Sequence, residues 1–118
     1  MFDSGLFIGW GEAYPGREEK ALLVFSETVT YWGKLLEDGR ISSYEPFWIG
    51  PHGGGLRGFF IVRGTPEQIV ALRADDEFLR LATRAQLCVT EVGIEDLYFG
   101  ESLRQLMERF EHEVGAFA

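Results

Sequence analysis

The chain has 118 residues, the size of one domain, and we expect a single domain over 1–118. Its net charge of −8 argues against nucleic acid and anionic membranes as partners, because proteins that bind either one carry a basic surface patch. Hydrophobic residues make up 46% of the chain and aromatic residues 14%, which is enough to build a packed core.

Cysteine usage and hydropathy narrow the class further. The one cysteine, Cys88, excludes an internal disulfide and fits a reducing cytoplasm, where we expect this protein. Cys88 lies in an apolar run and is expected to be a buried structural thiol. With one cysteine and two histidines, no structural zinc site is expected, and we predict neither a metal nor a cofactor. No apolar run approaches the roughly 20 residues of a membrane span, and no signal peptide is recognised.

The first element expected is a strand over residues 6–13. Its side chains alternate, with Leu6, Ile8 and Trp10 on one face and two glycines on the other. The alternation does not decide which of these faces meets the helices. A helix is then predicted over 17–38, because its apolar residues recur at steps of three and four, and Gly39 is a good C-terminal stop.

A β-hairpin is predicted over residues 42–64. Aromatic and β-branched residues gather in 44–49 and 59–62, and the glycine-rich sequence GPHGGG separates them. Proline cannot donate to a β-ladder, so Pro46 places the strand over 42–50 at an edge of the sheet and the strand over 57–64 inside it. The glycines beside His52 are a weak match to a phosphate cradle, since the Lys-Ser/Thr ending of a P-loop is absent.

The segment after the hairpin begins with a capping box. Thr65 is the N-cap, Pro66 takes the first helical position and Gln68 completes the box. A second helical segment starts near Asp75, so residues 66–86 form either one bent helix or two short ones. A fourth strand is expected within 87–99, and its acidic residues are typical of an edge strand.

A last helix is expected after Gly100, with an apolar stripe along one side. Glu108 and His112 lie four residues apart on this helix and could in principle share a metal ion. A lone pair of this kind on an acidic, solvated helix usually binds none, so no metal is predicted there.

The order β-α-β-β-α-β, followed by a helix, predicts an α+β protein of the ferredoxin-like type. With right-handed crossovers and the two edge strands assigned above, the four-stranded antiparallel sheet has the order 4-1-3-2. Helices cover one face of such a sheet and leave the other open. An open apolar face implies a partner, and we expect a sheet-to-sheet homodimer.

These features resemble the dimeric α+β barrel superfamily. The resemblance covers about 6–115 and rests on the element order, the glycine-rich hairpin turn and the sequence GTPEQ before the second helix. The pattern E-P-x-x-x-G-P-H-G-G-G is similar to that of uncharacterised bacterial members. The resemblance implies a pocket between the sheet and its covering helices. It singles out no member, since the chain has no Asn and no histidine before His52.

We predict that the pocket binds a small organic molecule between the sheet and the helices. His52 is the candidate for proton transfer, oriented by a carboxylate such as Glu12, because an imidazole titrates near neutral pH. The predicted ligand-binding residues are aromatic side chains and one arginine: Trp10, Trp32, Tyr44, Trp48 and Arg57. Two alternatives stay open: His52 serves only as a turn residue, and the whole protein is a dimeric accessory module without chemistry of its own.

Overall fold

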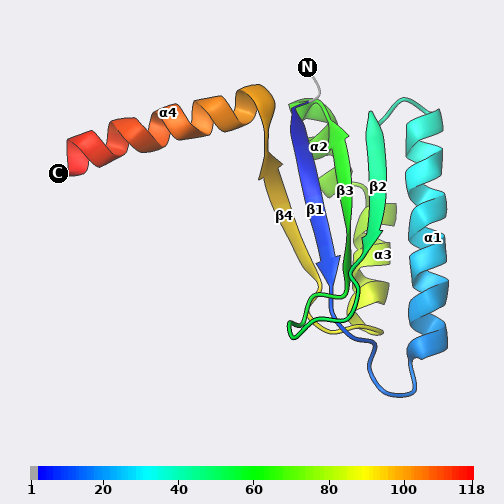
Figure 1. Cartoon of the computed structure of the whole chain (residues 1–118). Coiled ribbons are helices and arrows are strands. Elements are labelled where there is room, and N and C mark those ends of the chain that lie inside the picture. The colour runs from blue at the N-terminus through cyan, green and yellow to red at the C-terminus, as the bar shows by residue number, and fades with distance from the viewer. Residues whose placement is uncertain (1–2) are drawn as a thin grey trace.

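A computed structural model describes residues 3–118 (Figure 1). The four strands are β1 (Ser4–Trp10), β2 (Ser43–Trp48), β3 (Gly58–Gly64) and β4 (Gly93–Tyr98). The helices are α1 (Glu18–Glu37), α2 (Pro66–Arg73), α3 (Asp76–Gln86) and α4 (Gly100–Phe117). The predicted order of elements is therefore confirmed.

The strands form one antiparallel sheet in the order β2-β3-β1-β4, which is the predicted order read from the other edge. Pro46 lies in the edge strand β2, which has a neighbouring strand on one side only. Its missing N–H therefore removes no hydrogen bond to a strand on the other side. β1 is shorter than predicted. It ends at Trp10, and the chain beyond it keeps only an isolated antiparallel bridge between Ala13 and Val89, next to the hydrogen bond from the Gly11 N–H to the Thr90 carbonyl at 2.7 Å.

The core lies between the sheet and its covering helices. Leu6 and Val62 are fully buried from the sheet side and Trp32 from α1, and α2 and α3 contribute Leu72 and Phe78. Ile8 and Trp10 pack against this cluster, so the face of β1 that carries Trp10 is the face that meets the helices. Cys88 is 5% exposed, which confirms the predicted burial of its thiol.

The segment after β3 divides into two helices. Thr65 accepts a hydrogen bond from the Gln68 N–H, and the Gln68 side chain accepts one from the Thr65 N–H, so the predicted capping box is confirmed. Ala74 ends α2, and Asp75 takes an extended conformation before α3. The break at Asp75 frees its carboxylate to reach across to α1.

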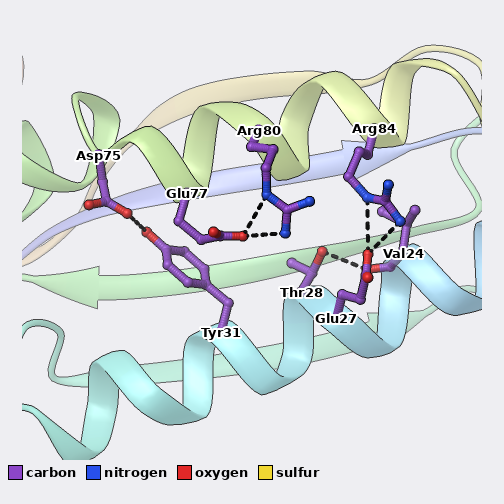
Figure 2. A network of polar contacts seen from close by, with 8 residues as sticks. All are labelled: Val24, Glu27, Thr28, Tyr31, Asp75, Glu77, Arg80 and Arg84. Carbon is purple, nitrogen blue, oxygen red and sulfur yellow. Dashed lines mark hydrogen bonds and ion pairs between the residues drawn. The ribbon is translucent and has the colours of Figure 1, made fainter.

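Polar contacts join α1 to α3, the two helices that lie side by side over the sheet (Figure 2). The Tyr31 hydroxyl donates to an Asp75 carboxylate oxygen at 2.6 Å, and Arg84 donates to Glu27 at 3.1 Å. Burial, together with the hydrogen bond to Asp75, raises the pKa of Tyr31 above its ordinary value of 10.0. The same hydrogen bond lowers the pKa of Asp75 below its ordinary value of 3.8. Folding therefore favours the neutral phenol and the ionised carboxylate.

Tyr31→Phe should lower the free energy of unfolding by about 1–2 kcal/mol at pH 7, because Asp75 loses its hydroxyl donor. A lowered carboxyl pKa stabilises the fold above pH 3.8, and this contribution is lost as the pH falls below that value. A raised phenol pKa stabilises the fold below pH 10, and this contribution is lost as the pH rises above it. Urea unfolding between pH 3 and 11 should show the alkaline loss shrinking in Tyr31→Phe.

Tyr44→Phe is the matched control. Tyr44 is half-buried, and its hydroxyl makes no hydrogen bond within residues 3–118, so this change should leave the pH profile unaltered. Equal pH profiles for Tyr31→Phe and the wild type would mean that the Tyr31–Asp75 bond does not contribute to stability.

The last helix stands apart from the rest of the fold. In Figure 1, α4 leaves the end of β4 and extends away on the side opposite to α1. None of its residues is buried. The helix carries the apolar stripe predicted from the sequence, and most side chains of this stripe are exposed within residues 3–118.

Candidate functional site

A cavity of about 640 Å³ lies between the sheet and the helices α1 and α3. Its volume falls within the range of about 300–1,000 Å³ that is typical of small-molecule sites. The interior is lined by residues from the sheet and from both helices, among them Phe60 of β3, Phe25 of α1 and Leu81 of α3. The lining is therefore mostly apolar.

Aromatic rings and small side chains together create this space. Trp10 packs against Phe25, Trp48 and Phe60, with ring centroids 5.8, 6.3 and 5.0 Å away. The helices add rings of their own, Phe25 and Trp32 among them, and they also present alanines to the cavity, at positions 21, 82 and 85. Rings from the sheet and the helices, together with the helix alanines, therefore surround a gap that the chain does not fill.

The open end of the cavity lies where three loops meet. Backbone hydrogen bonds join them: Gly11 to Thr90 at 2.7 Å, and Arg57 to Trp10 at 2.8 Å. The three charged residues of the lining belong to this end, namely Glu12, Arg57 and Glu18, the last in the first turn of α1. Arg57 donates to Glu12 at 3.0 Å, and the Glu12 side chain is 70% exposed. The interior therefore carries no charged side chain.

One buried polar atom of a residue that lines the cavity has no partner in the part of the chain that the structure describes. The Nε1–H of Trp32 is buried and makes no hydrogen bond within residues 3–118. A buried donor left unpaired costs about 1–3 kcal/mol, so such a group calls for an explanation. The other polar side chains of the inner wall are engaged, since the Thr28 hydroxyl donates to the Val24 carbonyl at 2.7 Å and the Tyr31 hydroxyl to Asp75.

His52 lies in the exposed loop between β2 and β3. Its Nδ1 accepts from the Gly54 N–H at 3.0 Å, so Nε2 carries the proton and donates to the Leu56 carbonyl at 2.5 Å. Both ring nitrogens are therefore used inside the loop. His52 is not among the residues that line the cavity, and it has no hydrogen bond to Glu12, whose carboxylate accepts from Arg57. Its role in proton transfer stays a prediction.

The comparisons with known proteins identify the fold. No family model and no curated protein matches the chain. A dimeric protein of unknown function with a ferredoxin-like fold, from Bacteroides fragilis, superposes with a TM-score of 0.60 at 12% identity, over 84% of this chain and all of that one. The chain has a ferredoxin-like fold.

Two further solved structures share this ferredoxin-like fold. A Bacteroides thetaiotaomicron protein described as a possible oxidoreductase matches with a TM-score of 0.62 at 14% identity, over 84% of this chain and all of that one. SnoaB, a cofactor-independent oxygenase from Streptomyces nogalater, matches with a TM-score of 0.55 at 16% identity, over 86% and 97%. The predicted resemblance is confirmed at the level of the fold, and identities this low show nothing more.

The ferredoxin-like fold brings most of the predicted site residues together. Glu12, Trp10, Trp32, Trp48 and Arg57 all line the cavity. Tyr44 does not: it packs against the core cluster farther along β2. Sequence reasoning missed Phe25, Phe60 and the alanines of α1 and α3. The signal that could have found the alanines is the run of small residues on the inner faces of two helices that cover an aromatic sheet.

Within residues 3–118, no group of three or more His, Cys, Asp or Glu side chains lies close enough to hold a metal ion. The same part of the chain has no helix that is long and apolar enough to cross a membrane. The cavity is therefore the candidate site.

Proposed function

We propose that this protein binds a small, uncharged, largely apolar organic molecule in the cavity between the sheet and the helices α1 and α3. The cavity itself carries the proposal, because a space of about 640 Å³ walled by aromatic rings is large enough for a ring compound and unfavourable to leave empty. Its interior offers no charge to neutralise an ionic ligand.

The buried donor of Trp32 refines the class of ligand. An oxygen acceptor on the ligand, such as a ketone, that reached this N–H would satisfy a group that has no partner within residues 3–118. Arg57 is an unfavourable alternative anchor for an anionic ligand, because Glu12 already pairs with it. We therefore propose a neutral ring compound with a carbonyl-type oxygen.

The solved neighbours are compatible with a small-molecule site of this kind. One is described as a cofactor-independent oxygenase and another as a possible oxidoreductase. We do not extend the proposal to catalysis, because His52 lies in the loop and not in the cavity wall. The proposal is accordingly one of binding.

We also propose that the protein is a homodimer, formed by the open face of the sheet. Phe59 stacks between Phe7 and Phe47 on this face, with centroids 5.1 and 4.8 Å away. Leu6 points to the helices, so the alternation of β1 turns Phe7 to the opposite side, and the register places it beside Ile61. A solved neighbour is itself described as dimeric. A non-catalytic accessory module remains the alternative, favoured if the cavity takes no ligand.

Two matched compounds test the ligand class: 1-tetralone, which has a ketone, and tetralin, the same ring system without it. Both should bind the wild type in tryptophan-fluorescence titrations. The ratio of the tetralin to the 1-tetralone dissociation constant should fall about fivefold or more in Trp32→Phe, because this variant removes the proposed donor. Trp48→Phe is the control, since Trp48 is 68% exposed at the cavity mouth and should leave the ratio within twofold.

A nuclear magnetic resonance measurement on the wild type needs no stable Trp32 variant. The chain has three tryptophans, so three indole N–H signals are expected, and Trp10→Phe and Trp48→Phe assign two of them. 1-Tetralone should move the remaining signal downfield more than tetralin does. If neither compound binds, the cavity is not a ligand site. If both bind and the signal responds equally, the ligand needs no acceptor.

A further inference from the structure

Helix α4 has an apolar seam that is left exposed within residues 3–118. The seam consists of Leu103, Met107, Phe110, Val114 and Phe117. Their exposed fractions range from 41% at Leu103 to 92% at Phe117. Large apolar side chains collected on one exposed face mark an interaction site.

The spacing of the seam indicates a protein partner. The five residues follow one another at steps of four, three, four and three, which is the heptad pattern of a helix packed in a narrow seam. Arg104 pairs with Glu101 and Glu108 along the polar side of α4, so these charges are satisfied within the helix. The apolar side is therefore the one left for a partner.

The direction of α4 is fixed at its base. The Ser102 hydroxyl donates to the carbonyl of Asp3 at 2.6 Å and accepts from the Phe99 N–H at 3.1 Å. Gly100 has a φ of +56°, a left-handed conformation that glycine adopts readily, and this turns the chain from β4 into the helix. These contacts point α4 away from its own sheet instead of folding it back (Figure 1).

The residues that lead into α4 lie on the open face of the sheet, where the side chains of Leu97 and Phe99 approach Gly5 of β1. Phe99, the residue before the helix, lies under the Arg63 guanidinium, 5.5 Å from the ring centroid. Leu97 precedes it on the same face and pairs in register with Gly5. A second copy seated on the open face would thus lie next to the helix that leaves its edge, and α4, about 27 Å long, has the reach to extend along it.

We infer that α4 is an arm that packs along the second copy of this chain in the homodimer. This inference rests on the proposed dimer and adds to it a reciprocal exchange, since two-fold symmetry makes each copy cover the seam of the other. A membrane surface fits α4 less well. The helix carries two arginines and four glutamates, a net charge of −2, whereas membrane-surface helices are rich in lysine and arginine.

Phe110→Glu tests the arm, because Phe110 is the central residue of the seam. The variant should raise the dissociation constant of the dimer about 100-fold or more in sedimentation velocity, since two copies of the seam each receive a charge. Gln105→Glu is the matched control. It adds the same charge to the same helix on the side opposite to the seam, and it should change the constant by less than threefold.

Hydrogen exchange of the wild type gives a second measurement. An isolated helix of this length is marginally stable in water, so α4 amides should exchange slowly in the dimer and fast after dilution below its dissociation constant. Suppose that the wild type is a dimer, that Phe110→Glu and Gln105→Glu have the same dissociation constant, and that the α4 amides exchange fast at every concentration. In that case α4 does not pack along the second copy, although the sheet-to-sheet dimer is still supported. A monomeric wild type overturns both.

Discussion

Phe59→Asp should convert the proposed homodimer into monomers of 13.4 kDa at micromolar concentration. Phe59 lies in the centre of the aromatic stack on the open face, and Phe7 and Phe47 flank it. A dimer would bury two carboxylates there, one from each copy, without an opposite charge to pair with them. We expect the dissociation constant to rise about 100-fold or more, measured by sedimentation velocity.

Val70→Asp is the control for this change. Val70 is 70% exposed on α2, on the helix side of the sheet, so the same charge there should leave the dimer intact. Phe59 does not belong to the core cluster under the helices, and circular dichroism should therefore find Phe59→Asp folded. If Phe59→Asp stays dimeric at nanomolar concentration, the dimer interface lies on a face other than the open face of the sheet.

Ala82→Phe should abolish most ligand binding. Ala82 lies on α3 with its side chain in the cavity wall, and a phenyl ring there occupies the space that the ligand needs. The dissociation constant for 1-tetralone should rise about tenfold or more, while the melting temperature stays equal or increases, because the ring fills a void. Fluorescence titration and thermal unfolding measure the two effects.

Ala71→Phe is the matched control for the filled cavity. Ala71 is exposed on α2 and does not line the cavity, so the same ring added there should leave the affinity within twofold. This control is needed because the open sheet face and α4 also expose apolar side chains that can adsorb a ring compound. Equal affinities in the two variants would place the bound compound outside the cavity.

The topology could be predicted from the sequence because local signals agreed with one another. Pro46 marked an edge strand, Thr65 and Gln68 marked a helix start, and the acidic residues after Cys88 marked the other edge. Each of these signals depends on residues close in the chain. The sheet order then followed from the handedness of crossovers.

The site was less predictable because it depends on packing between distant elements. The cavity arises where Trp10 and Phe60 of the sheet face Ala82 of α3, and no local pattern measures the gap between them. His52 stood out by its residue type, yet hydrogen bonds to Gly54 and Leu56 hold it in the loop. Such contacts follow from the conformation of a glycine-rich turn, which composition leaves open.

The orientation of α4 was undetermined for the same kind of reason. The stripe from Leu103 to Val114 predicted an amphipathic helix, but a periodic pattern does not name the surface that it packs on. That information lies in the turn at Gly100 and in the hydrogen bonds of Ser102, which together set the direction of the helix.

A crystal structure of the wild-type protein grown with 1-tetralone tests the proposed binding function most directly. We predict the ring in the cavity between Phe60 and Ala82, with the ketone oxygen within hydrogen-bond distance of Trp32 Nε1. A cavity closed by its own side chains, with the compound absent or bound only to the open sheet face, would contradict the proposal and favour a non-catalytic accessory module.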